Sequence, residues 1–382
     1  MYVLATLSGR GVAYSSQRFG YKVGIMDVFG DKDCLSAAVF WRHIGTCCTD
    51  QSYVDSKKFL NSLPVFKING FKGLVIGSGF EGKYGVLRKA NEILPLYANP
   101  LSVFKCIENP ILFFKTLKLL GVPFPKVNLS ADSLKDVRSD WILKDLGSSG
   151  GLGIKKPFER KSKNSQYFQK LFPGTAVSLS FFADGQNVIP LGYSKPVTTS
   201  QGNLPFVFCG LDGPIELNSS VDQEALRLSK LIVQKFKLRG FNGIDFLVSD
   251  KVVYFLDLNP RITAAFEILQ ESYNFCFFEK HIHLTRDIPC NTYITESFPA
   301  MKKKIISGFR IIYAQSDFYM NEHCQQSFFN NKFLTNIPNR KYFFKKYEPV
   351  CSVFLRSNSI LELQRALDDK VDFVYDKLSQ LN

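Results

Sequence analysis

The sequence predicts an α/β fold, and three observations support this prediction. Short apolar strands alternate with helices through the first third of the chain, a rhythm typical of a parallel sheet. Segments of strand character then follow one another over residues 140–215. A helix with clear 3.6-residue periodicity over 220–238 precedes two more strands, at 241–248 and 251–259. We therefore expect a parallel-sheet domain followed by a larger region of strands and helices.

The first third divides into alternating elements. We expect strands at 2–7, 21–29 and 73–79, because each is a short apolar run bounded by glycine or polar residues. Helices are expected between them, at 9–19 and 37–44. This order predicts that the strands pair in parallel through helical connections.

Two glycine-rich segments follow strands of this expected sheet, at 8–14 and 77–82. The second fits the spacing G-x-G-x-x-G of dinucleotide sites, but no acidic residue about 20 positions further on ends a strand. The first offers only G-x-G, at Gly9 and Gly11, and Asp27 closes the second strand, so a nucleotide-binding sheet stays possible. Glycines at strand-to-helix junctions are also needed for tight turns alone. Three interpretations therefore stay open: tight turns, contact with a substrate, and a dinucleotide site.

The remaining elements suggest where domains begin and end. An apolar helix at 110–120 ends at Gly121, and a linker with two prolines follows it. Ser220 is the expected N-cap of the helix at 220–238. In the last hundred residues we expect strands at 308–314 and 349–357 and a final helix at 360–378. The first domain boundary is expected near Asn99.

Composition limits the classes of function. The formal net charge is +14, but the lysines are spread along the chain, and the densest run is only Lys302–Lys304, so a nucleic-acid partner is not favoured. No apolar run approaches the length of a membrane span, and no signal peptide is evident at the N-terminus. Nine cysteines without a CxxC pair indicate a reduced, cytoplasmic protein with inert thiols.

The stretch WILKDLGSSGGLGIKK, residues 141–156, joins a strand to a glycine-rich loop. Backbone N–H groups of such a loop can approach a phosphate closely because no Cβ intervenes. Lys144 precedes the loop, and its ammonium group is suited to pair with the same phosphate oxygens. The candidate nucleotide-binding residues here are Lys144, Gly147, Ser148, Ser149, Gly150, Gly151 and Gly153. A glycine-rich hairpin without a ligand is the alternative.

Two carboxylates are expected to face each other on neighbouring strands. The turn between the strands is centred near residue 250, so antiparallel partners have numbers that sum to about 500, and Asp245 and Asp257 fit this condition. Asn259 lies two residues after Asp257 and projects from the same face. Two carboxylates and an amide oxygen suit Mg²⁺ (or Mn²⁺), which shares its coordination shell with substrate phosphates. A purely structural role must explain two acids within otherwise apolar strands.

Arg261 is the remaining candidate for chemistry. Pro260 ends the strand that carries Asp257, and Arg261 is presented just beyond it, where a guanidinium group can bind a phosphoryl group or a carboxylate in bidentate fashion. The acids, the arginine, the lysine and the glycine loop together form the equipment needed to bind MgATP and transfer its γ-phosphoryl group.

These motifs resemble those of the ATP-grasp superfamily. The resemblance lies in Lys144 with GSSGGLGI, in GIDF at 243–246 and in DLNPR at 257–261. It implies a Rossmann-like N-terminal domain, followed by an ATP-grasp fold whose α+β lid carries the glycine loop. The implied boundaries are residues 1–98 for the first domain, 99–285 for the ATP-grasp domain with its lid at about 125–190, and 286–382 for a region that completes the core.

The resemblance also implies an activity, an ATP-dependent carboxylate–amine ligase. A carboxylate attacks the γ-phosphorus, Lys144, the loop amides, Mg²⁺ and Arg261 stabilise the charge, and an amine then displaces phosphate from the acyl phosphate. The segment with Gln169 and Phe172 stands at the hinge that holds the nucleoside in the superfamily. This route needs no protein nucleophile, and His281 and His283, which alternate as on a strand, are interpreted as structural.

A finer resemblance points to the branch related to the tyramine–glutamate ligases of methanofuran biosynthesis, through MDVFGDKD at 26–33 and FPGTAVSLSFFADG at 172–185. The implied partners are a small carboxylate, a small amine and a second copy of the chain in a homodimer. Two alternatives remain: a nucleotide- or dinucleotide-binding module without ligase turnover, and RNA binding, which charge alone supports.

Overall fold

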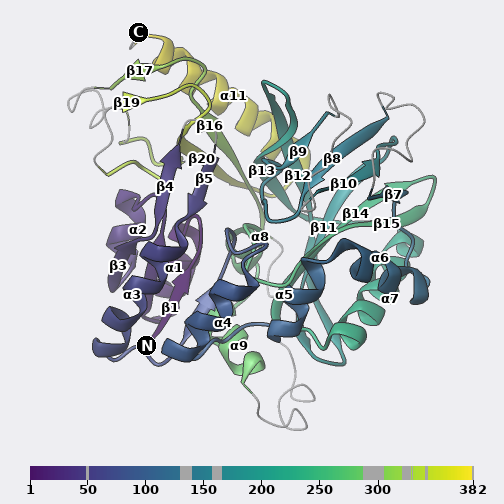
Figure 1. Cartoon of the computed structure of the whole chain (residues 1–382). Helices are drawn as coiled ribbons and strands as arrows, with labels where there is room; N and C mark the ends of the chain where they lie inside the picture. The colour runs from purple at the N-terminus through teal and green to yellow at the C-terminus, as the bar shows by residue number, and fades with distance from the viewer. Residues whose placement is uncertain are drawn as a thin grey trace.

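The structure is a computed structural model of the chain (Figure 1). The residues that it describes are 1–48, 51–129, 140–156, 166–286, 305–320, 328, 330–339 and 343–380. Their architecture is mixed α/β, as the sequence predicts. Lys302–Lys304 and the parts of the expected lid at 130–139 and 157–165 lie outside the described residues.

The N-terminal domain is built on a parallel sheet with the strand order β3-β2-β1-β6. Its strands are β1 (Tyr2–Ala5), β2 (Val23–Asp27), β3 (Phe40–His43) and β6 (Leu74–Ile76). The helices of the domain are α1 (Arg10–Gln17), α2 (Lys32–Ala37), α3 (Ser56–Ile68) and α4 (Tyr84–Ile93). A separate antiparallel pair consists of β4 (Gly45–Cys48) and β5 (Gln51–Val54).

The predicted strands of this domain are confirmed, but the helix expected at 37–44 is wrong. Helix α2 stops at Ala37, Ala38 is extended, and Phe40–His43 pairs in parallel with β2 as an edge strand. Aromatic residues favour strands, and the indole N–H of Trp41 donates to the Asp27 carboxylate at 2.8 Å. Tertiary contacts with β2 thus decide the conformation of this segment.

Two helices and a small antiparallel sheet follow. The helices are α5 (Leu101–Ile107) and α6 (Pro110–Leu119), and the side chain of Asn109 caps α6 by accepting from the backbone of Leu112. The small sheet, here called the lid sheet, has the order β7-β10-β8-β9. Its strands are β7 (Val127–Asn128), β8 (Trp141–Asp145), β9 (Ile154–Lys155) and β10 (Gln166–Lys170).

The largest element is an antiparallel sheet of eight strands in the order β15-β14-β11-β12-β13-β16-β20-β18. Its strands are β11 (Thr175–Asp184), β12 (Val188–Gln201), β13 (Leu204–Ile215), β14 (Arg239–Ser249), β15 (Val252–Asn259), β16 (Ile306–Tyr313), β18 (Leu334–Thr335) and β20 (Pro349–Ser357). Two short strands, β17 (Phe318–Tyr319) and β19 (Phe343–Phe344), pair separately.

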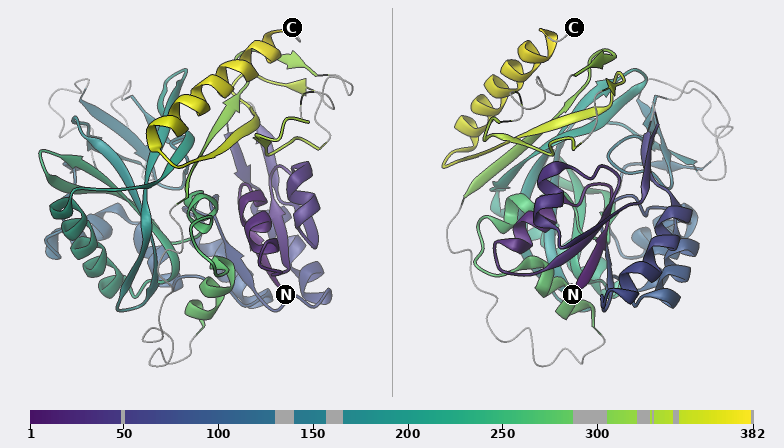
Figure 2. Two further views of the ribbon diagram at one scale, coloured as in Figure 1. Left: turned by 180° about the vertical axis from the view of Figure 1, so that it is seen from behind. Right: turned by 90° about the vertical axis from the view of Figure 1, so that its left-hand side faces the viewer.

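Helices α7 (Ser219–Phe236), α8 (Ala265–Gln270), α9 (Phe277–Thr285) and α11 (Ile360–Ser379) accompany this sheet. The N-cap of α7 is Asn218 and not Ser220, because the Asn218 side chain accepts the backbone N–H of Ser220 at 3.1 Å. His281 and His283 lie on α9, so the strand expected for them is also wrong. In the C-terminal region, β16 pairs with β13 of the same sheet, and α11 covers β16 and β20 (Figure 2).

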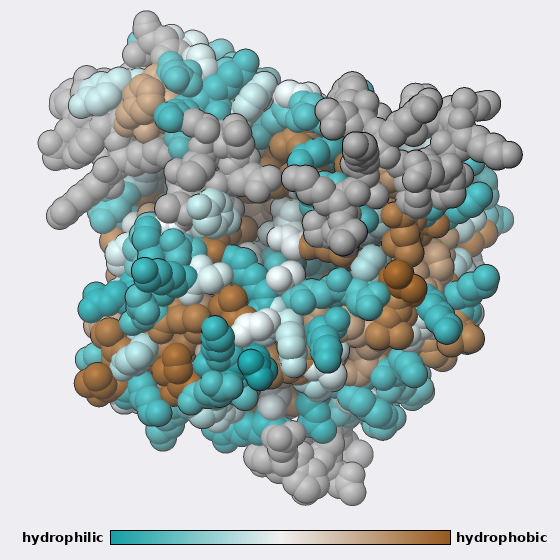
Figure 3. All heavy atoms as spheres, viewed as in Figure 1, coloured by the Kyte–Doolittle hydropathy of each residue, from teal (hydrophilic) through white to brown (hydrophobic). Residues whose placement is uncertain are grey.

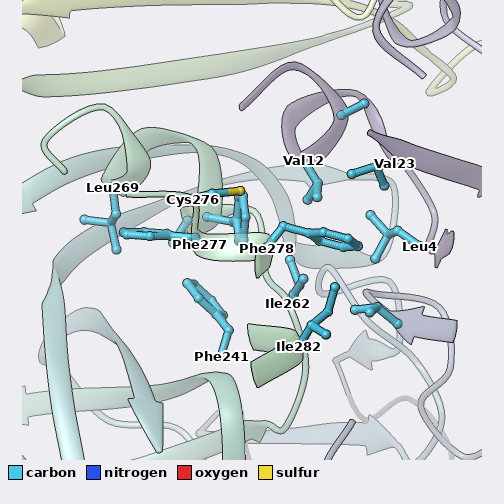
Figure 4. Packing of buried hydrophobic residues seen from close by; sticks show 14 of the residues in the cluster. Leu4, Val12, Val23, Phe241, Ile262, Leu269, Cys276, Phe277, Phe278 and Ile282 are labelled. Atoms are coloured by element: carbon cyan, nitrogen blue, oxygen red, sulfur yellow. The ribbon is translucent and has the colours of Figure 1, made fainter. Parts of the chain in front are cut away.

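A buried hydrophobic cluster joins the N-terminal domain to the large sheet (Figure 4). Leu4 and Val12 come from β1 and α1, whereas Phe241, Ile268 and Phe277 come from β14, α8 and α9, and all five are buried. Full burial of each such side chain contributes about 1.5–3 kcal/mol to stability. The two regions therefore share one core, which fixes the loops of the first domain opposite the strand ends of the large sheet.

In the view of Figure 3, the hydrophobic side chains of the described residues form separate groups among hydrophilic ones. Among the described residues, no helix has both the length and the apolar character required to cross a membrane.

Candidate active site

One large cavity, of about 2160 Å³, lies between the loops of the N-terminal domain, the lid sheet and the large sheet. Ligand sites usually occupy about 300–1000 Å³, so this cavity has room for more than one substrate. Its walls include almost every candidate residue predicted from the sequence: Lys144, Gly147, Ser148, Ser149, Gly150, Gly151, Gln169, Phe172, Asp245, Asp257, Asn259 and Arg261. Gly153 is not in the wall of the cavity.

Lys144 projects from β8 across the cavity toward β15. Its ammonium nitrogen lies 3.4 Å from the backbone oxygen of Leu256 and 3.4 Å from Oε1 of Gln169, and it lies 5.8 Å from the centre of the Tyr167 ring. Burial lowers the pKa of Lys144, but Tyr167 and then Asp257 raise it, and the net direction is upward. The lysine is therefore held charged beside the two acids.

The glycine loop between β8 and β9 is held in place on both sides. Gly147, Gly150 and Gly151 have φ values of 147°, 63° and 74°, a region that favours glycine. The backbone of Phe208 on β13 donates to the oxygen of Gly150 at 2.9 Å. A Cβ on Gly151 would lie 1.7 Å from the oxygen of Phe206, so a side chain there would separate the loop from β13.

Gly153 lies at the base of the glycine loop. A Cβ there would lie 1.8 Å from Oγ of Ser148, and the Gly153 oxygen accepts from the backbone of Asp145 at 2.9 Å. The glycine thus closes the base of the loop, where no side chain fits. We interpret Gly153 as a turn residue that shapes the loop, and its contact with a nucleotide stays a prediction.

At the hinge, Gln169 and Phe172 line the cavity. Gln169 lies on β10 opposite Ile142 and is 2% exposed, and its amide nitrogen has no hydrogen-bond partner among the described residues. The ring of Phe172 packs edge-on against Tyr254 at 4.9 Å. These residues provide an apolar wall with one polar group.

Asp245 and Asp257 are direct cross-strand partners on β14 and β15, which confirms the register predicted from their numbers. Ser178, the partner of Asp245 on β11, donates its hydroxyl to Oδ1 of that carboxylate. Asn259 donates from Nδ2 to Oδ2 of Asp245 at 3.0 Å, and Oδ1 of Asp257 accepts from the backbone of Leu258 at 2.9 Å. The three predicted oxygen ligands thus stand on one face of one sheet.

The environment of the acids favours a bound cation. Burial and then the charge of Asp257 raise the pKa of Asp245, while burial raises the pKa of Asp257 against the opposing effect of Lys144. Like charges directly opposite each other in a sheet are destabilising by up to about 1 kcal/mol. Two carboxylates and an amide are hard oxygen donors that fit Mg²⁺ and leave positions for phosphate oxygens and water.

Arg261 has protein partners that the sequence does not indicate. It forms an ion pair with Glu81, which belongs to the glycine segment 77–82 of the N-terminal domain. Arg261 also donates from one terminal nitrogen to Oδ1 of Asn259 at 2.9 Å and from the other to the backbone oxygen of Ile262 at 3.2 Å. The guanidinium group therefore links the first domain to the proposed metal ligands.

Three residues in this neighbourhood were not predicted as site residues: Glu81, Ser178 and Tyr167. Of the interpretations left open for segment 77–82, the turn is confirmed by positive φ values at Gly79 and Gly82, but the segment also carries Glu81. The sequence signal that could have identified Glu81 is an acidic residue inside a glycine-rich loop. The partner of Ser178 follows only from the order of strands, which the sequence leaves open.

The first glycine segment forms the opposite end of the cavity. Arg10 makes a bidentate pair with Glu267 on α8, at 2.5 and 2.7 Å, and a Cβ on Gly11 would lie 2.8 Å from the same carboxylate. Asp31 is 5% exposed and lines the cavity. Burial raises its pKa to about 8. This end of the cavity thus carries charged groups of both signs.

Asp27 is not placed to bind a ribose. The residue is fully buried, and its two oxygens accept from the backbone of Gly9 and Gly30, each at 3.0 Å, and from the indole of Trp41. These protein donors occupy the carboxylate, so it holds the strand-to-helix turns together. The geometry gives no support to a dinucleotide site at this position.

Comparisons with known proteins agree with this architecture. Residues 107–265 match the family model of the ATP-grasp domain. The chain is 24% identical over 269 residues to an uncharacterized protein of Methanocaldococcus jannaschii, a match that covers 66% of this chain and 61% of that protein. The chain thus spans less than two thirds of the length of this relative.

Two solved structures illustrate the shared fold. Carboxyaminoimidazole ribonucleotide synthase from Aspergillus clavatus, complexed with ATP, gives a TM-score of 0.66 at 14% identity and covers 100% of this chain and 99% of its own. The second is the biotin carboxylase domain dimer of 2-oxoglutarate carboxylase from Hydrogenobacter thermophilus, in complex with MgADP, ADP and bicarbonate. It gives a TM-score of 0.65 at 12% identity, and the match covers 93% of this chain and 86% of that chain.

The solved structures show the fold, and the family model supports an ATP-grasp domain over residues 107–265. They leave the finer resemblance, to the tyramine–glutamate ligase branch, as a prediction.

Proposed function

We propose that this protein is an ATP-dependent ligase that joins a carboxylate to an amine through an acyl phosphate. One observation carries the proposal: the paired acids Asp245 and Asp257 share a cavity wall with Lys144 and with the glycine loop at 147–151. Such a set of groups binds a triphosphate together with a divalent cation. ATP and Mg²⁺ (or Mn²⁺) are the implied nucleotide and metal.

Each group of the chain has a stated task in this proposal. The glycine loop encloses the phosphates with backbone N–H groups, and Lys144 places a positive charge on their oxygens. Arg261 faces the site of transfer and stabilises charge that develops there. Asp245, Asp257 and Asn259 would hold the metal ion, which supplies neutralisation of the phosphate charge. Gln169 and Phe172 would contact the nucleoside.

The two other substrates are proposed to occupy the end of the cavity formed by the N-terminal domain. Arg10, Asp31 and Glu267 line this end and offer charges of both signs to a polar substrate. An oxygen of a carboxylate bound there attacks the γ-phosphorus, and ADP leaves as the acyl phosphate forms. The amine nitrogen then attacks the acyl carbon, phosphate leaves, and the nitrogen loses a proton to give the amide. Enclosure by the lid excludes water, which would hydrolyse the acyl phosphate.

The finer parts of the proposal come from the resemblance. They are a role in cofactor biosynthesis of the methanofuran kind, a homodimer, and a location in the cytoplasm. Glutamate and tyramine are therefore the first pair of substrates to test.

The test is a screen of carboxylates and amines for release of ADP and phosphate from ATP and Mg²⁺. We expect ADP formation that requires both substrates, and loss of this activity in Lys144→Ala and in Asp257→Ala. Full activity in both variants would refute the proposal. Tight binding of ATP with no ADP formed under any pair of substrates would favour a nucleotide-binding module.

A further inference from the structure

We propose that Glu81 is a positioning residue that holds Arg261 away from the carboxylates of Asp245 and Asp257, so that these acids stay open to a divalent cation. The inference rests on the proposed function, since it concerns the proposed metal ligands. It adds a residue of the N-terminal domain to the site.

A continuous chain of contacts supports this role. The backbone N–H of Gly79 donates to Oε2 of Glu81 at 2.7 Å and fixes the carboxylate, whose other oxygen pairs with Arg261. Arg261 donates to Asn259, and Asn259 donates to Asp245. Glu81 thus positions Arg261, and Arg261 in turn positions Asn259 beside Asp245.

The charges around Asp257 explain why Glu81 is needed to position Arg261. Arg261 is 8% exposed, and both its positive charge and the negative charge of Glu81 act on Asp257. Without Glu81, the guanidinium group would lose its acidic partner, and Asp257, on which its charge already acts, would be the alternative. An ion pair formed there would compete directly with a metal ion for the same oxygens.

The loop of Glu81 is also in contact with the lid. A Cβ on Gly82 would lie 2.8 Å from Cα of Gly147, and a Cβ on Gly147 would lie 3.4 Å from the oxygen of Glu81. The two glycine segments thus pack backbone against backbone. Glu81 therefore occupies the point where the first domain, the lid and the proposed metal site meet.

The experiment measures Mn²⁺ affinity, by titration in the presence of ADP, for the wild type, Glu81→Ala, Arg261→Ala and the double variant. We expect Glu81→Ala to weaken Mn²⁺ binding about tenfold, which corresponds to about 1.4 kcal/mol. The double variant should regain affinity to within about threefold of the wild type, because no guanidinium group remains to occupy the acids. Glu81→Gln should fall between the wild type and Glu81→Ala.

Glu92→Ala on the exposed face of α4 is the matched control and should leave Mn²⁺ affinity unchanged. Unchanged affinity in Glu81→Ala, or a double variant as weak as that single variant, would overturn the inference alone. A wild-type chain that binds no Mn²⁺ would overturn both this inference and the proposed function. Loss of ADP formation with normal Mn²⁺ affinity in Glu81→Ala would assign Glu81 a different role and also overturn the inference.

Discussion

Asp245 and Asp257 stand directly opposite each other on β14 and β15. Burial raises the pKa of both carboxyls, and the positive charge of Lys144 opposes this rise without reversing it. Two negative charges in this position oppose folding. The paired acids therefore lower stability while the proposed metal site requires them. Substitution of one acid should raise stability and reduce activity.

Asp257→Asn is expected to make the metal-free protein more stable by about 0.5–1 kcal/mol, because it removes a like charge from a cross-strand pair. The same change should reduce ADP formation by at least about 100-fold, since a metal ligand is lost. Urea unfolding without divalent cations measures the first effect. Mg²⁺ should stabilise the wild type and not the variant, and a variant that is less stable than the wild type would contradict this account.

Lys144→Met keeps most of the length of the side chain and removes its charge. We expect ADP formation to fall by about 100-fold or more, because an electrostatic contact to the transferring phosphoryl group is lost. The neighbouring groups Tyr167 and Gln169 remain, so the fold should be retained. Steady-state kinetics together with a thermal unfolding curve checks both statements. A drop in stability with normal turnover per folded molecule would contradict the expected role.

Gly151→Ala tests whether the glycine loop is held against β13. The new Cβ would collide with the oxygen of Phe206, so we expect the loop to detach and ATP affinity to fall about tenfold. Gly202→Ala is the matched control, because Gly202 also has a positive φ, of 57°, but has open space around its Cβ position. Backbone strain of about 1–2 kcal/mol is common to both variants. Equal losses of ATP affinity, measured by calorimetry, would show that strain and not the collision is responsible.

His281 provides a prediction of pH dependence. Nδ1 accepts from the backbone of Phe241 at 2.9 Å, Nε2 lies 3.0 Å from the oxygen of Tyr97, and burial lowers the pKa to about 4. The unfolded chain binds the proton near pH 6.5, so the unfolded state is favoured as the pH falls from 6.5 to 4. The stability that His281 contributes at neutral pH should thus decrease by about 3 kcal/mol over this range.

Urea unfolding of the wild type and His281→Gln at several pH values isolates this contribution. The difference in free energy of unfolding between the two proteins should shrink toward pH 4. A difference that is constant with pH would show that His281 is not held neutral. Asp31, whose pKa is raised to about 8, makes a contribution to the free energy of unfolding that changes with pH in the opposite direction. This contribution is the same in both proteins, so it cancels in the difference between them.

Local patterns were sufficient to predict much of the arrangement of the candidate site. The register of Asp245 with Asp257 followed from a short turn near residue 250, because pairing across a hairpin is fixed by chain geometry. Lys144 and the glycine loop were evident because glycines cluster directly after a strand. Helices α6 and α11 were predictable from the periodicity of their apolar residues.

Contacts between distant segments were not predictable. Glu81 and Arg261 are 180 positions apart, and nothing local indicates that they pair. Phe40–His43 has too few residues for its period to distinguish a helix from a strand, and the neighbouring β2 decides its conformation. His281 and His283 share a spacing that a strand and a helix both allow, and only the packing of α9 against β14 selects the helix.

The hydrophobic cluster shared by β1, α1, α8 and α9 has a mechanical consequence. It joins the large sheet to the domain that carries Glu81 and Arg10. The lid sheet has a smaller cluster of its own, around Trp141 and Phe168, and contributes Tyr167 to the core of the large sheet. We therefore expect the N-terminal domain and the large sheet to move as one unit, and local motion to be greater in the lid sheet, whose own core is small.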